Sequence, residues 1–354
     1  MFITGVTKSL HNNIRQKIIK PKYTCMNKRR SLSSWATTFL IVTGVPAGLY
    51  LYKCVMLVLF QNKLIYMGYL PPGSRHEQLT TDKIVSNLNI TEQTVQTPDR
   101  KQLKGFVVER KHTDEKTLNK DQQQQKGPII IYFQGNAGNM IHRFDLFNTM
   151  LKAVPDATIV GICLRGFGSS SGRASERGLE KDAQSILNHV YSTYDNNNNK
   201  LKRKRPIYIY GHSLGGAVAI GLLAKSKEQY QKRIHGLIIE NTYTSILDMV
   251  KTLYPRYTPY PLIAKYFLWN HWPSLTLINK IKIPILFLSS EKDEIVPVEH
   301  MQELYDAATN ITQCTMVKFP RSTHMDIYQV ESGLFKSTLS SFIDKNNKRS
   351  EDDE

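Results

Sequence analysis

The fold can be approached from one stretch, Ile207-Tyr208-Ile209-Tyr210-Gly211-His212-Ser213-Leu214-Gly215-Gly216-Ala217-Val218-Ala219-Ile220. Its first four residues are apolar and predict a buried strand, and the small residues after Ser213 suit a helix. Between them lies Gly-x-Ser-x-Gly, the pattern of a nucleophile elbow, in which a sharp turn exposes a serine hydroxyl. This context predicts Ser213 as a nucleophile. The Leu214 N–H, at the start of the helix, is predicted to donate to an oxyanion.

Strands alternate with helices on both sides of this stretch. We expect further strands at 91–97, 101–110, 128–133, 157–164, 234–240, 283–289 and 315–319, and helices at 141–154, 176–194, 299–308 and 325–344. The polar, low-complexity segment 112–126 is predicted to be a disordered loop, and segment 196–205 a solvated loop. The alternation predicts an α/β fold, with a mainly parallel sheet that helices cover on both faces.

A serine, a carboxylate and a histidine each follow a predicted strand, in the order Ser213, Asp293, His324. Catalytic groups gather at the carboxyl ends of parallel strands, so we expect these three to meet. Serine is too weak an acid to attack unaided, so a histidine must take its proton and a carboxylate must fix the imidazole tautomer. The order serine, acid, histidine is that of an α/β-hydrolase.

Other acids and histidines compete for these roles. The rival carboxylates are Asp248, Glu291, Glu294 and Asp326. Asp293 is favoured because it lies a few residues beyond a strand end. Among the ten histidines, His324 follows the last predicted strand, whereas we expect His212 to pack behind the elbow and His300 to lie on a helix surface.

Two loops are expected to flank the nucleophile. The glycine-rich loop 134–139 allows close backbone approach and is predicted to supply the second oxyanion donor, the N–H of Asn136. Segment 242–281 is rich in aromatic residues and proline; it predicts either a small cap that walls an apolar acyl pocket or a helix pair packed on the sheet. Since the four cysteines are scattered and no metal or P-loop pattern occurs, we expect neither a metal nor a cofactor.

The N-terminal region predicts a membrane anchor. Residues 1–34 hold eight Lys/Arg and no acid, and 35–60 form an apolar run whose one charge is Lys53. Such a run is long enough to cross a hydrocarbon core of ~30 Å, and no small-residue cleavage pattern ends it. The basic arm predicts a single-pass type II orientation, with the C-terminal domain in the lumen of the endoplasmic reticulum or another endomembrane. A mitochondrial presequence followed by a membrane anchor is the competing interpretation.

The positive charge is concentrated in two segments. Residues 1–34 and 200–205 carry thirteen Lys/Arg, which account for most of the formal net charge of +17, so no nucleic-acid-binding face is expected. The chain is therefore predicted to comprise a basic arm (1–34), an anchor (35–60), a linker (61–90), an α/β-hydrolase domain (91–345) and a charged tail (346–354).

Six motifs resemble those of the Bem46-like membrane serine hydrolases, whose animal relative is α/β-hydrolase domain-containing protein 13. The motifs are Tyr132-Phe133-Gln134-Gly135-Asn136-Ala137-Gly138-Asn139, Arg165-Gly166-Phe167-Gly168, Gly211-His212-Ser213-Leu214-Gly215-Gly216, Ile238-Ile239-Glu240-Asn241-Thr242-Tyr243-Thr244-Ser245, Asp293-Glu294-Ile295-Val296-Pro297 and His324-Met325-Asp326. The resemblance implies an α/β-hydrolase fold, the triad of Ser213, Asp293 and His324, and an N-terminal anchor. A more distant similarity to the α/β-hydrolase depalmitoylases implies acyl-protein thioesters as substrates.

Two departures from the family pattern leave the catalytic groups in place. Gln134 stands where the family has histidine, and 322–326 lack the glycine and asparagine usual around His324. We therefore expect a membrane-anchored serine hydrolase of esters or thioesters that forms an acyl-enzyme. A lumenal domain would exclude cytosolic palmitoyl-proteins and favour lipid or small-ester hydrolysis. The alternative is a catalytically silent membrane scaffold with the same fold.

Overall fold

The structure is a computed structural model that describes residues 33–80, 86–111, 127–194, 204–226 and 231–352. The chain divides into two compact units, Met1–Leu51 and Tyr52–Glu354. Helix α1 (Ser34–Leu59) is long and apolar enough to cross a membrane, and most of it belongs to the first unit. The predicted loop 112–126 and most of the predicted loop 196–205 lie outside the described residues.

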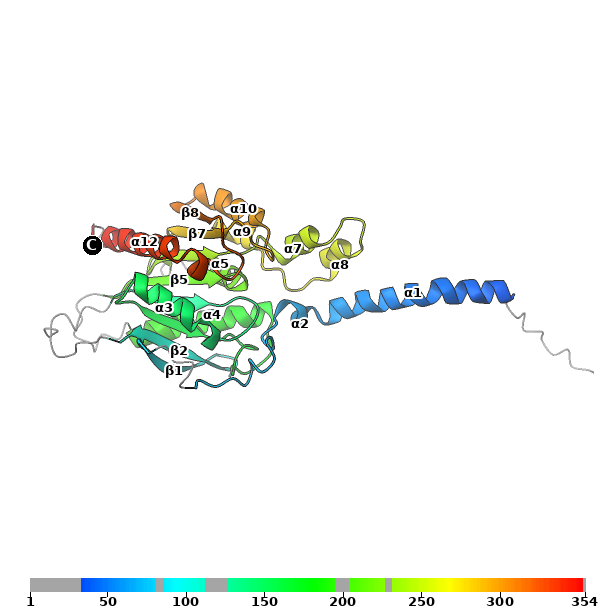
Figure 1. Ribbon diagram of the computed structural model, residues 1–354, viewed down its shortest axis with the longest axis horizontal. Helices are drawn as coiled ribbons and strands as arrows, with labels where there is room; N and C mark the ends of the chain where they lie inside the picture. Colours follow the sequence, from blue (N-terminus) through cyan, green and yellow to red (C-terminus); the bar gives the residue numbers. More distant parts are fainter. Residues whose placement is uncertain (1–32, 81–85, 112–126, 195–203, 227–230, 353–354) are drawn as a thin grey trace, which may run out of the picture. The chain divides into compact units, whose positions relative to one another are not determined.

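The second unit is built on an eight-stranded sheet in the order β1-β2-β4-β3-β5-β6-β7-β8 (Figure 1). The strands are β1 (Leu88–Gln96), β2 (Gln102–Arg110), β3 (Ile129–Phe133), β4 (Thr158–Ile162), β5 (Ile207–His212), β6 (Ile234–Glu240), β7 (Ile285–Ser290) and β8 (Cys314–Phe319). Strand β2 runs antiparallel to β1 and β4, and the other neighbouring strands are parallel. The predicted, mainly parallel sheet is confirmed.

Helices cover both faces of this sheet, as predicted. On one side α3 (Phe144–Ala153), preceded by the short η2 (Ile141–Arg143), contacts α12 (Ser332–Asp352). A second set of contacting helices comprises α4 (Glu176–Tyr194), α5 (Leu214–Lys225), α9 (Ser274–Ile278) and α10 (Val298–Thr309). Every residue of β3, β4, β5 and β7 is buried, because these strands are sandwiched between two helical layers.

Two predicted boundaries differ from the structure. Part of the predicted linker 61–90 packs on the domain: it forms α2 (Gln61–Ile65), buries Tyr66, and pairs Met67 with Ala137. These contacts are made largely by backbone and polar groups, so a periodic spacing of apolar residues could not predict them from the sequence. At the other end, α12 continues to Asp352, beyond the predicted domain limit at 345.

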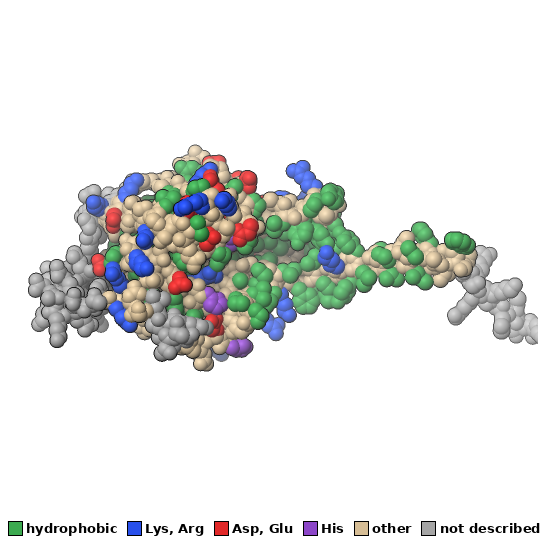
Figure 2. Space-filling view, viewed as in Figure 1, with side chains coloured by type: hydrophobic (Ala, Val, Ile, Leu, Met, Phe, Trp, Pro, Cys, Tyr) green, Lys and Arg blue, Asp and Glu red, His purple; other side chains and the backbone are tan. Residues whose placement is uncertain are grey.

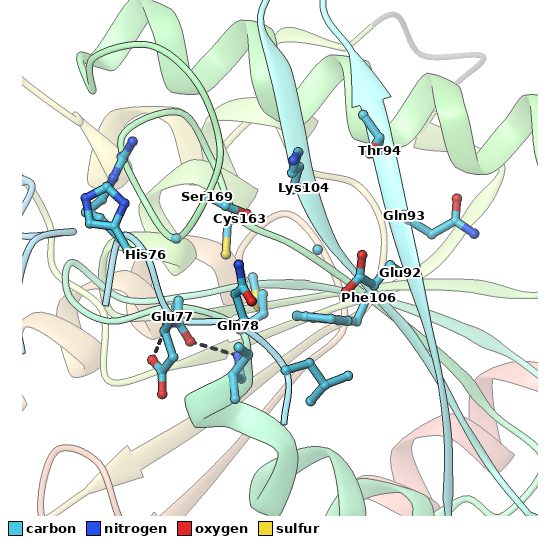
Figure 3. A pocket seen from close by; sticks show the side chains of 17 residues that line it. His76, Glu77, Gln78, Glu92, Gln93, Thr94, Lys104, Phe106, Cys163 and Ser169 are labelled. Carbon is cyan, nitrogen blue, oxygen red and sulfur yellow. Dashed lines mark hydrogen bonds between the residues drawn. The ribbon is translucent and has the colours of Figure 1, made fainter. Parts of the chain in front are cut away.

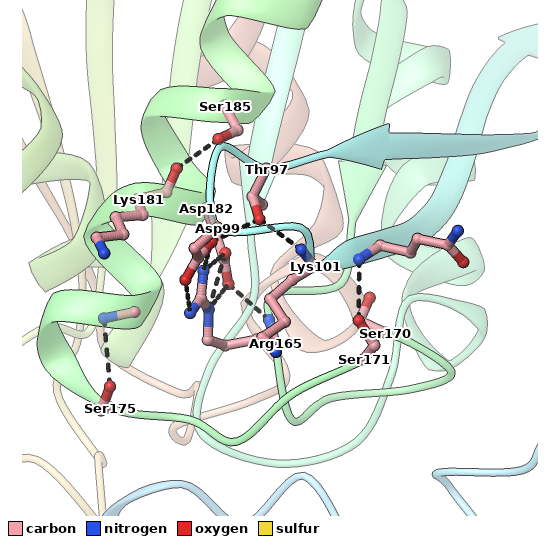
Figure 4. A network of polar contacts seen from close by, with 12 residues as sticks. Thr97, Asp99, Lys101, Arg165, Ser170, Ser171, Ser175, Lys181, Asp182 and Ser185 are labelled. Carbon is pink, nitrogen blue, oxygen red and sulfur yellow. Dashed lines mark hydrogen bonds and ion pairs between the residues drawn. The ribbon is translucent and has the colours of Figure 1, made fainter.

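A partly buried ionic network holds the β1–β2 turn against the rest of the domain (Figure 4). The Arg165 guanidinium donates to Asp99 (2.7 and 3.0 Å) and to Asp182 of α4 (2.7 Å). The hydrogen bond from Arg165 holds the pKa of Asp99 below its usual range, whereas burial raises the pKa of Asp182. The arginine of the Arg-Gly-Phe-Gly motif therefore joins three segments that are distant in sequence.

Candidate active site

Ser213 occupies a strained turn between β5 and α5. Its φ of 52° and ψ of −117° are unusual for a residue with a side chain and are typical of a site where backbone strain serves function. The turn is tight: a Cβ on Gly215 would overlap the carbonyl oxygen of Phe133 in β3. Leu214 begins α5, so its N–H has no acceptor within the helix and is available to an oxyanion.

Asp293 and His324 form a buried pair in the loops after β7 and β8. His324 Nδ1 lies 2.7 Å from Asp293 Oδ2, and the two side chains are 4% and 2% exposed. The other carboxylate oxygen, Oδ1, accepts the backbone N–H groups of Ile295 (2.8 Å) and Val296 (2.7 Å). Both oxygens of Asp293 are thus occupied, and the bond to Nδ1 leaves Nε2 of His324 to accept a proton.

The structure brings the elbow and the histidine loop together through His212. As expected, His212 is buried next to the elbow; its Nε2 lies 2.9 Å from the carbonyl oxygen of His324, and the two rings are 4.9 Å apart. Burial, followed by the neighbouring His324, lowers the pKa of His212 well below its usual value. In the described part of the chain no hydrogen bond joins the Ser213 hydroxyl to His324; such bonds often tighten only when substrate binds.

The rival carboxylates do not contact the His324 ring. Asp248 lies in the first turn of α7 (Ile246–Leu253), where its carboxylate accepts from the hydroxyl of the N-cap residue Ser245 at 2.6 Å, and Asp326 accepts a backbone N–H within its own loop at 2.6 Å. Glu294 accepts the backbone N–H of His324 (3.1 Å) and so supports the loop rather than the imidazole. Of the expected acids, Asp293 is the one placed against the ring.

The predicted oxyanion loop lies beside Ser213. A Cβ on Gly135 would come within 3.5 Å of the Ser213 Cβ, so the backbone next to Asn136 closely approaches the nucleophile. The amide of Gln134, which replaces the family's histidine, donates to the carbonyls of 137 (3.4 Å) and 138 (3.1 Å). Gln134 therefore stabilises the loop through hydrogen bonds to the loop's own backbone.

Two buried polar residues near the site were not anticipated. His300 is not on a helix surface: it is 5% exposed and lies 2.7 Å from the Thr244 hydroxyl, and burial lowers its pKa. Glu240, the last residue of β6, is buried, accepts a hydrogen bond from Tyr210, and has its pKa raised to about 7 by burial. Its carbonyl oxygen accepts the Ser213 N–H at 2.8 Å. The available signal was an acid at the end of the apolar run 237–239.

One cavity lies apart from these groups. A polar cavity of about 490 Å³ is bordered by 75–79, β2 and the end of the oxyanion loop; Figure 3 shows Glu77, Lys104 and Cys163 around it. Its lining does not include Ser213, Asp293 or His324. Burial raises the pKa of Cys163 to about 12, which keeps this cysteine a neutral thiol. Among the described residues, no cluster of His, Cys, Asp or Glu has the composition of a metal site.

Segment 242–281 leaves the sheet as α7, α8 (Tyr260–Phe267) and α9. Neither α7 nor α8 has a buried residue, and the two helices contact each other. An apolar groove of about 190 Å³ separates them from α2 and the end of α1. This arrangement favours a protruding cap over a helix pair packed on the sheet.

Comparisons with known proteins agree with this architecture. A family model described as "Serine aminopeptidase, S33" matches residues 143–281. The α/β hydrolase domain-containing protein WAV2 of Arabidopsis thaliana is 32% identical over 307 residues, which cover 84% of this chain and 92% of that protein. Protein bem46 of Schizosaccharomyces pombe is 35% identical over 288 residues, which cover 81% and 85%.

More distant similarities concern part of the chain or the fold alone. Lysophosphatidylserine lipase ABHD12 of Rattus norvegicus is 31% identical over 196 residues, 51% of this chain and 45% of that protein. The esterase Pf2001 of Pyrococcus furiosus superposes on 76% of this chain and 96% of its own, with a TM-score of 0.55 and 18% identity.

The molecule is therefore a hydrolase with the α/β-hydrolase fold. Its similarity to bem46 and WAV2 over most of their length shows that the chain belongs to the Bem46-like α/β-hydrolase family.

Proposed function

We propose that the chain is a membrane-anchored serine hydrolase that cleaves ester or thioester bonds through an acyl-enzyme. The buried Asp293–His324 pair, 2.7 Å apart beside a strained elbow serine, carries this proposal. Asp293 orients the ring, His324 moves the proton, and Ser213 is the nucleophile. No cofactor is needed, because serine, imidazole and carboxylate together suffice for acyl transfer.

The proposed reaction has two stages. Ser213 Oγ attacks the acyl carbonyl carbon while its proton passes to Nε2 of His324, and the oxyanion accepts the N–H groups of Leu214 and Asn136. The tetrahedral intermediate collapses, and His324 returns the proton to the departing alcohol or thiol. Water then attacks the acyl-Ser213 ester with His324 as base, which releases the carboxylic acid and restores the serine.

Lipid esters are the favoured substrate class. The partial similarity to a protein named a lysophosphatidylserine lipase supports them, and so does an apolar helix that would hold the enzyme at a bilayer. Acyl-protein thioesters are a second candidate, which rests on the resemblance to depalmitoylases. In the proposed type II orientation the domain would be lumenal, which also favours lipids over cytosolic palmitoyl-proteins.

Purified full-length protein should be assayed with lysophosphatidylserine, p-nitrophenyl acyl esters and an S-palmitoyl peptide. We expect turnover by the wild type and a loss of about 10⁴-fold or more in Ser213→Ala. Ser337→Ala, on the exposed side of α12, is the matched control and should retain full activity. A folded wild type that hydrolyses none of these substrates would support the silent scaffold instead, and the ratio of kcat/KM values would separate lipid esters from thioesters.

A further inference from the structure

The cap helices α7 and α8, together with α2 and the C-terminal end of α1, expose many large apolar side chains. Figure 2 shows hydrophobic side chains gathered over the region of α2, α7 and α8. In the second unit these exposed side chains are Tyr52, Val55, Leu59, Phe60, Leu64, Leu253, Tyr254, Tyr257, Leu262, Tyr266, Phe267 and Trp269. Contiguous apolar patches of this kind are rare on soluble proteins and mark interaction sites.

The apolar groove joins the two halves of this surface, which we call the cap surface. The anchor side contributes Leu57, Val58 and Leu64, and the cap side contributes Val250, Ile263 and Phe267. Phe60 is the one residue between α1 and α2, so the cap surface continues directly from the apolar helix. The groove has a volume of about 190 Å³ and is lined mainly by apolar side chains.

Hydrogen bonds hold α2 against the end of the cap. Gln61 Nε2 donates to the carbonyl oxygen of Phe267 (3.1 Å). Asn62 Oδ1 accepts from Trp269 Nε1 (3.0 Å) and from Asn270 Nδ2 (2.6 Å). Because these bonds fix the two halves to each other, the cap surface exists before any partner binds.

The charge of the cap surface is positive. Lys63, Arg256 and Lys265 are exposed around it. Asp248, the one acid in segments 52–66 and 242–281, is already paired with Lys251 at 2.8 Å. Tyrosine and tryptophan are also enriched there, as they are at the boundary between lipid and water. Basic residues beside an apolar surface attract acidic phospholipids.

We propose that the cap surface docks on the membrane that α1 enters, with acidic phospholipid headgroups on the basic side chains and acyl chains against the groove. A helix spanning the bilayer brings its last turns into the headgroup region, where the cap surface begins. Docking would present the hydrolase domain to the leaflet in one orientation. This inference does not depend on the chemistry of Ser213.

Lipid contact at one cap residue tests the proposal. The full-length protein, with Cys25→Ser and Cys314→Ser, is given a single exposed cysteine by Leu262→Cys in α8 or, as control, Ser337→Cys in α12; Cys54 and Cys163 are buried. Each cysteine carries an environment-sensitive fluorophore, and the protein is reconstituted in vesicles that contain phosphatidylserine and spin-labelled phosphatidylcholine. We expect the spin label to quench emission at 262 several-fold more than at 337.

Neutralising two basic side chains of the cap surface is the second test of the proposal. Arg256→Gln with Lys265→Gln should shift the docking equilibrium about 25-fold toward the undocked state in phosphatidylserine vesicles, and little without that lipid. Equal quenching at the two labelled positions would overturn the proposal. Blue-shifted emission at 262 without lipid quenching would also overturn it, because a protein partner or a second copy would then cover the surface. Hydrolysis is not the readout, so failure here is distinct from failure of the proposed reaction.

Discussion

Asp293→Asn removes one negative charge with almost no change in shape. Oδ1 of Asp293 accepts two backbone N–H groups, at 2.8 and 2.7 Å, and Oδ2 faces Nδ1 of His324 at 2.7 Å. The side-chain amide of the introduced asparagine can lie in either of two orientations, with its oxygen or its NH₂ toward the backbone N–H groups. With its NH₂ toward the backbone, it would lose two hydrogen bonds and oppose two donors, so the oxygen should stay there and the NH₂ should face His324.

This orientation forces the wrong histidine tautomer. Two hydrogen bonds of about 1 kcal/mol each favour it by about 2 kcal/mol, before the opposed donors are considered. Nδ1 of His324 must then accept, so the ring proton lies on Nε2, the nitrogen that should receive the Ser213 proton. The imidazolium also loses its carboxylate. We expect kcat to fall about 10⁴-fold, with KM changed little because the Asp293 side chain is 2% exposed and is hydrogen-bonded to His324.

The assay is steady-state hydrolysis of a p-nitrophenyl ester, with thermal unfolding recorded for each variant. Glu294→Gln is the matched control: among the described residues, Glu294 accepts the backbone N–H of His324 (3.1 Å) and no other hydrogen bond, so its loss of rate should stay within about tenfold. Retention of more than about a tenth of kcat by folded Asp293→Asn would refute the reasoning. Equal losses in both variants would do the same, since they would indicate a shared structural effect.

Three further predictions concern stability and topology. Burial raises the pKa of Glu240 to about 7 from an unfolded value of ~4.3, so the unfolded chain loses its proton first and stability falls between these pH values. Glu240→Gln should remove up to about 4 kcal/mol of that loss at pH 8 and leave stability at pH 4 unchanged, which urea unfolding at both pH values measures. Gly215→Ala should destabilise the fold by about 3 kcal/mol, because its Cβ would overlap a β3 carbonyl, whereas Gly333→Ala has open space and should be neutral or slightly stabilising; equal melting temperatures would contradict this. Asn89 and Asn310 are exposed, so a lumenal domain should carry endoglycosidase-sensitive glycans at both, and their absence together with protease access in intact microsomes would overturn the type II orientation.

The elbow and the acid–histidine pair were predictable because local pattern and strand topology determine them together. Gly-x-Ser-x-Gly after an apolar strand requires a tight turn, and the carboxyl ends of β5, β7 and β8 lie along one edge of the sheet. Asp293 and His324 therefore had to approach this edge, although no periodicity showed that Oδ1 of Asp293 would be held by two backbone N–H groups.

The remaining features depend on contacts between distant segments. Residues 61–79 lack a regular apolar pattern, and they are held by bonds such as Met67 N–H to the carbonyl oxygen of Asn136 (2.7 Å). His300 lies on a helix that looks half polar, yet the loop after β6 covers it through Thr244. Tertiary packing determines both the position of 61–79 and the burial of His300, and neither helix propensity nor composition predicts such packing.

Covalent labelling of Ser213 is the most direct test of the central claim. Membranes containing the full-length wild type, Ser213→Ala or His324→Ala would be treated with a fluorophosphonate and digested with a protease. The mass of the elbow peptide, which contains position 213, would then be measured by mass spectrometry. The proposed mechanism predicts a phosphonyl adduct on Ser213 in the wild type, and none on the elbow peptide of either variant. A folded wild type without the adduct, or with the adduct on another residue, would contradict it.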